Sequence, residues 1–299
     1  MSLDAYNVKV RKHQNGLVEY RVYEKAVQTG IVPKNLLKRQ NYNTSVAVDI
    51  PFLDKPLKME NYVSEYGWQK AKKREMRSIQ NSVKRTKDAI FDYSNATCWK
   101  WFCTFTFSQK CVERDNFCAV SKKMTSWLRN MRQRYCPDMK YVLVPERHRD
   151  GSWHFHGLFA DCDGFNFVPA LNNKEFYRGK LNKQYLKPLK RKGQQVYNLS
   201  NFKLGFTDCT EVKDTKKVAN YILKYITKEL CVDTPGRKRY WCSQNLKKPS
   251  EETFVTDIEF CSFVETLLCE CLEKNPDTYC NTFEVEHGDF HNTISYIYC

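Results

Sequence analysis

The chain of 299 residues has no apolar run long enough to cross a membrane. Its most hydrophobic window, residues 96–107, is interrupted by Lys100, whereas a membrane helix needs about 20 consecutive apolar residues. The N-terminus also lacks the short basic region and apolar segment of a secretory signal. We therefore expect a cytoplasmic protein that neither spans a membrane nor is secreted.

The sequence has no Cys-x-x-Cys pair, although it contains fourteen cysteines. Closely spaced cysteine pairs would indicate a zinc site or a redox motif, and disulfide frameworks are typical of short secreted chains. Here the cysteines are scattered over a long chain, so we expect reduced thiols. A composition of 41% hydrophobic and 14% aromatic residues excludes a disordered or low-complexity protein.

Acidic residues are scarce outside the C-terminal region. The chain carries 49 Lys and Arg against 34 Asp and Glu, for a net charge of +15. Residues 251–299 hold eleven acidic residues and one basic residue, so the first 250 residues carry a net +25. Such an excess is typical of proteins that bind polyanions, and nucleic acid is the leading candidate partner. A protein with a merely basic surface is the alternative.

Three segments are expected along the chain. Residues 8–23 alternate around Asn15-Gly16, a dipeptide whose positive φ angles suit a two-residue hairpin turn. Residues 30–62 contain three prolines without clear periodicity, which indicates a linker. We divide the chain into an N-terminal β-hairpin and linker (residues 1–65), a central domain (66–246) and an acidic C-terminal appendage (247–299).

The central domain alternates helical and extended patterns. Helices are expected over residues 66–93, 117–131 and 215–230, the last with Asp214 or Thr215 as its N-cap, and strands over 97–107, 141–144, 153–160 and 203–212. Residues 163–200 form a polar, basic insertion. This order predicts an α+β fold with a central, mostly antiparallel sheet flanked by helices.

The strand over residues 153–160 carries His154 and His156. Side chains at i and i+2 of a strand leave the same face, about 7 Å apart along the chain, so both imidazoles could contact one cation. Two histidines at this spacing are also common on an ordinary polar sheet face.

Glu146 strengthens the metal hypothesis if the hairpin loop has three residues. A loop over residues 149–151, with Gly151 in the left-handed conformation, places Glu146 directly opposite His154 on the same face. A two-residue turn would place Glu146 on the opposite face. Two imidazoles and one carboxylate suit a catalytic Mn²⁺ or Mg²⁺ ion, or less readily Zn²⁺. His148, on the same hairpin, could substitute as a ligand.

A second cluster lies on the helix predicted over residues 215–230. In a continuous helix, Tyr221, Tyr225, Lys224 and Lys228 fall together with Lys217 within an arc of about 100°. An amphipathic helix whose Tyr and Lys residues line the boundary with water has the same pattern. The functional alternative is a tyrosinate that attacks phosphorus, assisted by lysine charges.

Taken together, these motifs resemble those of the HUH endonuclease superfamily of rolling-circle replication initiators. The strand ending in Thr104-Phe105-Thr106-Phe107, the His154-Phe155-His156-Gly157 strand and the Tyr221-x-x-Lys224-Tyr225-x-x-Lys228 helix stand in the order of that family's three motifs. The paired tyrosines are most similar to those of initiators from small single-stranded DNA phages, of the microvirus gene A type, and related plasmids. The resemblance covers roughly residues 66–246.

The resemblance implies a role for each of these residues. His154, His156 and Glu146 would bind a divalent metal ion, Mg²⁺ or Mn²⁺, that acts on the scissile phosphate. Tyr221 and Tyr225 would be nucleophiles that form a 5′-phosphotyrosine link, with Tyr221 preferred if only one is used. Lys224 and Lys228 would support the phosphate or the phenolate. The implied core is a ferredoxin-like HUH endonuclease domain over residues 66–246.

The resemblance also implies partners and alternatives. The substrate would be single-stranded DNA at a replication origin in a bacterial host cell, with no membrane involved. No Gly-x-x-x-x-Gly-Lys-Ser/Thr loop is present, so a host helicase and the host replication machinery are expected to supply unwinding. A plasmid mobilisation relaxase, a two-tyrosine transposase, a non-enzymatic basic DNA-binding protein and a zinc hydrolase are the alternatives.

Overall fold

A computed structural model shows the fold and describes residues 4–29, 65–171, 176–177, 180–181, 188–234, 236–287 and 290–299. The chain divides into two compact units, one formed by Met1–Lys55 with Lys248–Cys299 and the other by Pro56–Lys247. The predicted linker over residues 30–62 lies outside the described residues. Within the described part of the chain, no helix combines the length and the apolar character that crossing a membrane requires.

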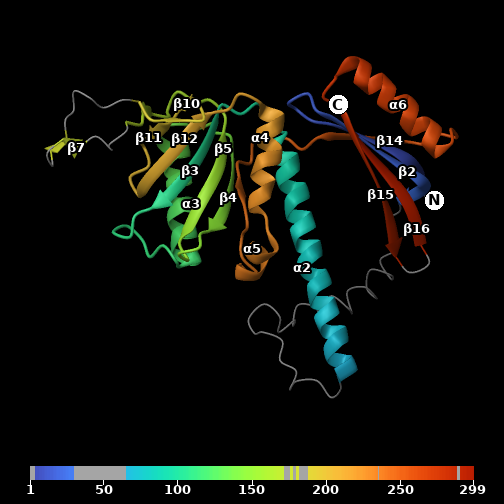
Figure 1. The fold of residues 1–299 in the computed structure, drawn as a ribbon, viewed down its shortest axis with the longest axis horizontal. Helices are drawn as coiled ribbons and strands as arrows, with labels where there is room; N and C mark the ends of the chain where they lie inside the picture. The colour runs from blue at the N-terminus through green and yellow to red at the C-terminus, as the bar shows by residue number, and fades with distance from the viewer. Residues whose placement is uncertain are drawn as a thin grey trace. The chain divides into compact units, whose positions relative to one another are not determined.

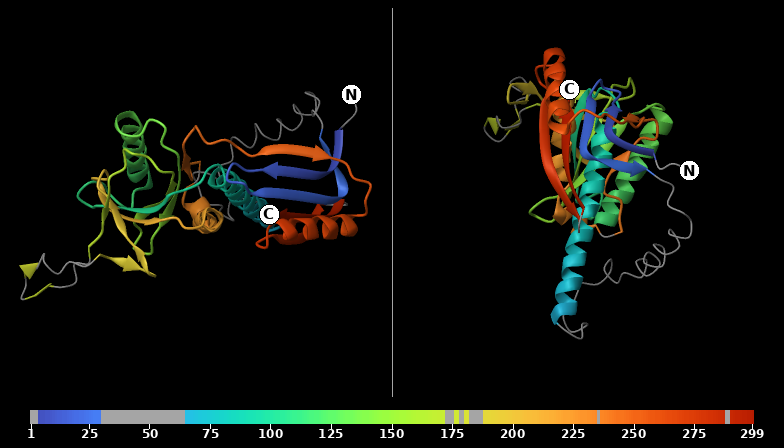
Figure 2. Two further views of the ribbon diagram at one scale, coloured as in Figure 1. Left: turned by 90° about the horizontal axis from the view of Figure 1, so that it is seen from above. Right: turned by 90° about the vertical axis from the view of Figure 1, so that its right-hand side faces the viewer.

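The first unit combines the two ends of the chain in one sheet. Its strands are β1 (Asp4–Lys12), β2 (Val18–Thr29), β14 (Ser250–Phe254), β15 (Tyr279–His287) and β16 (Phe290–Tyr298), in the antiparallel order β14-β1-β2-β16-β15. Helix α6 (Phe260–Lys274) packs its apolar side on Val8, Val10 and Val22 (Figures 1 and 2). The N-terminal hairpin and the acidic appendage, expected as separate segments, are therefore joined in one sheet.

The predicted N-terminal hairpin is confirmed, but its turn differs from the expectation. Lys12 pairs with Val18, and the amide of His13 donates to the carbonyl of Leu17, so three residues form the loop. In this loop only Gly16 has a positive φ, +87°. The expected two-residue turn is wrong because a three-residue loop needs the left-handed conformation at its last position alone.

The second unit is built on a seven-stranded sheet. In order across the sheet its strands are β13 (Trp241–Cys242), β4 (Tyr141–Arg147), β5 (Trp153–Phe159), β3 (Trp101–Phe107), β12 (Gly205–Glu211), β11 (Tyr197–Leu199) and β6 (Phe167–Pro169). All neighbouring strands are antiparallel. The predicted α+β class is confirmed, and β3 buries every second side chain, as its alternating pattern requires.

The rest of the segment predicted as an insertion contributes short strands. β7 (Phe176–Tyr177) pairs with β8 (Lys180–Leu181), and β9 (Lys190–Arg191) pairs with β10 (Gln194–Gln195). β6 and β11 extend the main sheet at one edge. The additions therefore leave the central strands β4, β5, β3 and β12 side by side.

Helices cover both faces of this sheet (Figure 1). Helix α3 (Phe117–Arg134) lies on one face, where Trp127 contacts Phe105 and Phe159 in the aromatic core. Helix α2 (Glu65–Ser94), helix α4 (Thr215–Ile222), the 3₁₀ turn η4 (Leu223–Tyr225) and helix α5 (Lys228–Asp233) lie on the other. The succession β3, α3, β4, β5 matches the start of a ferredoxin-like βαββαβ unit, whereas α4 follows β12 instead of preceding it.

The single helix predicted over residues 215–230 is wrong. Asp214 caps α4 as expected, but the α-helix ends at Ile222 and a 3₁₀ turn follows. Ile226 is extended, with φ −90° and ψ 92°, and the hydroxyl of Thr227 accepts from the amide of Leu230 to begin α5. The N-cap at Thr227 satisfies an amide at the start of a new helix, which makes the break locally stable.

Candidate active site

The hairpin of β4 and β5 has the geometry on which the prediction for Glu146 depended. The amide of His148 donates to the carbonyl of Ser152, so residues 149–151 form a three-residue loop, and Gly151 has φ +84°. Glu146 consequently pairs directly with His154 across the two strands. The predicted register is confirmed, and Glu146 shares a sheet face with both histidines.

Two threonines of β3 hold the histidine rings from the neighbouring strand. Thr104 lies opposite His156 with its hydroxyl 3.1 Å from Nδ1, and Thr106 lies opposite His154 with its hydroxyl 3.0 Å from Nδ1. These bonds fix both rings with their Nε2 atoms available for other partners. The Thr-Phe-Thr-Phe pattern alone gave the threonines no role, although alternating hydroxyls beside His-x-His were the available signal.

The carboxylate of Glu146 turns toward the second histidine instead of the one directly opposite. Its Oε2 is 2.7 Å from Nε2 of His156 and 3.8 Å from Nε2 of His148. Nε2 of His154 lies 3.2 Å from the hydroxyl of Ser152, and the ring of His148 stacks on that of His154 with centroids 3.9 Å apart. His148, named as a substitute ligand, thus belongs to the same cluster.

Electrostatics keep this cluster in a defined protonation state. The hydrogen bond with His156 lowers the pKa of Glu146, so its carboxylate is ionised near neutral pH. Burial lowers the pKa of His154 to about 4 and also lowers the pKa of His156. Both imidazoles are therefore neutral near pH 7, the form that can bind a metal ion. Because an ionised carboxylate only accepts, Nε2 of His156 carries the proton in its bond to Glu146.

The two tyrosines lie beside the histidines in different environments. The ring of Tyr225 stacks on that of His156, with centroids 3.8 Å apart and an angle of 8° between the planes. Tyr225 is buried at 7% exposure, whereas Tyr221 is 46% exposed. Their hydroxyls are 3.4 Å apart, with Tyr225 as the donor. The structure therefore brings both predicted nucleophiles to the face that carries His154 and His156.

One of the two predicted lysines lies on the tyrosine rings. Nζ of Lys224 is 3.6 Å from the ring centre of Tyr221 and 4.6 Å from that of Tyr225. A hydrogen bond with Lys224 lowers the pKa of Tyr221, while burial raises the pKa of Tyr225. Lys228 begins α5 beyond the break at Ile226, and its side chain is exposed. The continuous stripe predicted from helical periodicity is thus interrupted between Tyr225 and Lys228.

A hollow of about 470 Å³ opens beside this cluster. Glu146 and His148 line it from the hairpin, and Tyr225 and Thr227 line it from the helical side. As the side chains stand, no three His, Cys, Asp or Glu residues in the described ranges are grouped closely enough to hold a metal ion. All fourteen cysteines are free, in agreement with the expectation of reduced thiols.

Comparison with known proteins gives one match. Residues 100–230 match a family model of replication-associated proteins of the ORF2 type, and this range contains every predicted site residue. No curated protein and no solved structure shows a significant match. Over the segment that carries the histidines and tyrosines, the chain is therefore similar to replication-associated proteins, which supports a Rep-like protein involved in initiating DNA replication.

Proposed function

We propose that this protein is a metal-dependent, site-specific single-strand DNA endonuclease and strand transferase of the HUH type that initiates rolling-circle replication. The convergence of Tyr221, Tyr225 and Lys224 on the face that carries His154 and His156 is the observation that carries this proposal. It lies within the segment that is similar to replication-associated proteins. The net +25 of the first 250 residues adds the charge that a DNA substrate requires.

The residues present fit a divalent metal ion in their donor chemistry. Nε2 of His156 and Oε2 of Glu146 are 2.7 Å apart, close to the roughly 3 Å that separates adjacent ligands when each metal bond is about 2.0–2.2 Å long. Thr104 and Thr106 hold the Nδ1 atoms, as partners of metal-bound histidines commonly do. A bound Mg²⁺ or Mn²⁺ ion would supply Lewis-acid polarisation of the scissile phosphate.

Tyr221 is the better-placed first nucleophile. It is exposed to an incoming strand, and the ammonium of Lys224 at its ring favours the phenolate. The phenolate oxygen of Tyr221 forms a bond to phosphorus while the P–O3′ bond breaks, and the departing 3′ oxygen takes up a proton. The 5′-phosphotyrosine ester retains the energy of the phosphodiester, so rejoining needs no ATP.

Tyr225 would act in a second transfer. Its hydroxyl, 3.4 Å from that of Tyr221, could attack a regenerated origin while the first ester is still present. The released 3′-hydroxyl would then attack the Tyr221 ester and close the displaced strand into a circle. A separate host helicase and the host replication machinery would supply unwinding and synthesis, because the sequence lacks a nucleotide-binding Gly-x-x-x-x-Gly-Lys-Ser/Thr loop.

The test uses single-stranded oligonucleotides with a randomised centre, so that no origin needs to be known in advance. Full-length protein is incubated with this library and Mn²⁺, and covalent protein–DNA adducts are isolated on a denaturing gel and sequenced. We expect a common cleavage site, a 5′ link to protein and loss of adducts with EDTA. Tyr221→Phe should remove most adducts, Tyr225→Phe should spare single cleavage but impair strand transfer, and the double variant should be inactive.

Two lysine variants separate the site from general charge. Lys224→Met removes the ammonium over the Tyr221 ring, whereas Lys228→Met removes an exposed ammonium beyond the helix break. We expect a much larger loss of cleavage rate for Lys224→Met, with equal DNA affinity for both variants. Tight binding of DNA with no metal-dependent adduct at any sequence would refute the enzymatic proposal in favour of a non-enzymatic DNA-binding protein.

A further inference from the structure

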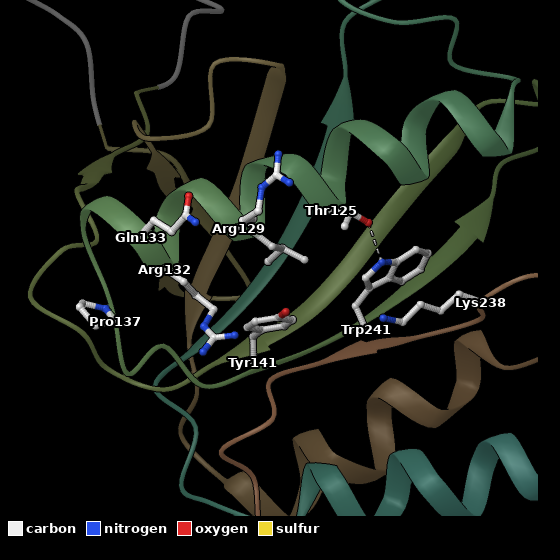
Figure 3. Close-up of a pocket in the computed structure, with 9 residues that line it drawn as sticks. Thr125, Arg129, Arg132, Gln133, Pro137, Tyr141, Lys238 and Trp241 are labelled. Atoms are coloured by element: carbon white, nitrogen blue, oxygen red, sulfur yellow. Dashed lines mark hydrogen bonds between the residues drawn. The ribbon is translucent and has the colours of Figure 1, made fainter.

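The opposite face of the same sheet carries a second hollow, of about 430 Å³, between helix α3 and the edge strand β13. Figure 3 shows its lining: Arg132 from α3 lies beside the ring of Tyr141 of β4, and Lys238 lies beside Trp241 of β13. Tyr141 stacks on Phe159 and Trp241 contacts Phe155, so both belong to the face that α3 covers. This α3–β13 hollow is therefore separated by the sheet from the face that carries the histidines and tyrosines.

The charge of the α3–β13 hollow is of one sign. Its lining includes Arg129, Arg132 and Lys238 and no carboxylate. A neighbouring hollow of about 500 Å³ shares Arg129 and Lys238 with it and adds Lys122 and Arg237, again without a carboxylate. Among the described residues, neither Arg129, Arg132 nor Lys238 forms an ion pair. Positive charges gathered without counter-ions in a concave surface attract an anion.

Two buried polar atoms in these hollows have no hydrogen-bond partner within the described part of the protein. They are Nε of Arg132 in the first hollow and Oγ of Ser121 in the second. Buried donors are nearly always satisfied, so an unpartnered guanidinium nitrogen beside a hollow indicates a missing acceptor. The planar donors of arginine suit the oxygens of a phosphate group.

The aromatic residues make the base of the hollow rigid. The indole N–H of Trp241 donates to the hydroxyl of Thr125 at 3.0 Å, and Nζ of Lys238 lies 5.6 Å from the centre of the Trp241 ring. Trp241 and Tyr141 are only 3% and 8% exposed. They are thus too buried to stack on bases, so the hollow is suited to phosphates and not to base recognition.

We propose that the α3–β13 hollow binds the phosphate backbone of DNA, as a second contact on the sheet face opposite the cleavage site. The proposal rests on the proposed function, because it takes DNA as the substrate. A strand engaged by the tyrosines would have to pass the β13 edge to reach the hollow. Only DNA that extends well beyond the cleavage site can make both contacts, and the second contact is independent of sequence.

The test measures DNA affinity as a function of salt with fluorescein-labelled single strands. One is a short oligonucleotide that spans only the cleavage site, and the other extends it at both ends with arbitrary sequence. Arg129→Gln/Lys238→Gln removes two cations and leaves Arg132, whose Nε is buried, in place, so folding is preserved; Arg132→Gln is tested separately. Lys72→Gln/Lys73→Gln, on the exposed side of α2, is the charge-matched control.

For the long strand, we expect Arg129→Gln/Lys238→Gln to reduce the slope of log K against log salt by about 1.4, because each phosphate contact of a single strand contributes about 0.7. The control should reduce it by less, and cleavage of the short strand should be unchanged. A slope equal to that of the wild type or of the control would overturn the proposal. Failure of the proposed function would appear separately, as absence of cleavage by the wild type.

Discussion

Glu19 of β2 is buried in the first unit among cations, and its removal should weaken that unit in a way that depends on pH. Glu19 is 1% exposed and accepts from Nη1 of Arg11 at 2.8 Å and from Nε of Arg21 at 2.5 Å. Burial alone would raise its pKa, but the bonds and charges of His13, Arg21 and Arg11 outweigh burial and lower the pKa from 4.5 to about 2. A shift of this size corresponds to about 3 kcal/mol of folding free energy near pH 7.

The direction of the pH dependence follows from the lowered pKa. The stabilisation is complete above the unfolded value of 4.5 and is lost as the pH falls through the folded value of about 2. Glu19→Gln should therefore lower the free energy of unfolding of this unit by about 3 kcal/mol near pH 7 and by only about 1.5 kcal/mol near pH 3. The matched control is Glu252→Gln, whose exposed partner is Lys12 and whose loss should cost less than about 1 kcal/mol.

The assay must distinguish the two units. All six tryptophans (positions 68, 99, 101, 127, 153 and 241) lie in the unit formed by residues 56–247, so tryptophan fluorescence reports on that unit alone. Amide hydrogen exchange of peptides from β1 and β2 measures the opening of the first unit. Glu19→Gln should accelerate exchange there and leave the fluorescence transition unchanged. An effect of equal size near pH 7 and pH 3, or no effect, would refute the reasoning.

Two further predictions concern the strand that carries the histidines. Thr104→Val removes the hydroxyl 3.1 Å from Nδ1 of His156, so Mn²⁺-dependent cleavage should fall about 10- to 100-fold while circular dichroism is unchanged; full activity would contradict a positioning role. Gly157→Ala would place Cβ 2.9 Å from Cγ of Leu143 and 3.0 Å from Cε2 of Phe159, so we expect a loss of about 1–3 kcal/mol in denaturant unfolding followed by tryptophan fluorescence. A wild-type midpoint would show that β4 and β5 can separate without cost.

Local patterns in the sequence predicted much of the fold. The alternation over residues 97–107, the apolar spacing over residues 117–131 and the hairpin around Gly151 all correspond to observed elements, because burial on one face determines each pattern. The union of the two chain ends in one sheet could not be predicted this way. Pairing of β1 with β14 and of β2 with β16 joins residues more than 200 positions apart, and no local periodicity specifies such partners.

The site was predictable where strand geometry controls it. The period of two placed His154 and His156 together, and the loop length placed Glu146 opposite His154. The choice of Glu146 to bond His156, the supporting hydroxyl of Thr104 and the stacking of Tyr225 depend on side-chain packing between elements. A sequence without its tertiary contacts does not determine such packing.

The 3₁₀ turn explains why two tyrosines four residues apart are not equivalent. In a continuous α-helix, four steps of about 100° leave Tyr225 only about 40° from Tyr221, so both phenols would have similar exposure. The three steps through η4 turn by about 120° each, which widens the separation to about 100° and brings Lys224 to within about 20° of Tyr221. This rotation agrees with Tyr225 packed on His156, Tyr221 exposed and Lys224 at the Tyr221 ring. If the proposed function holds, the backbone itself thus sets the order in which the nucleophiles are used, with the exposed tyrosine first.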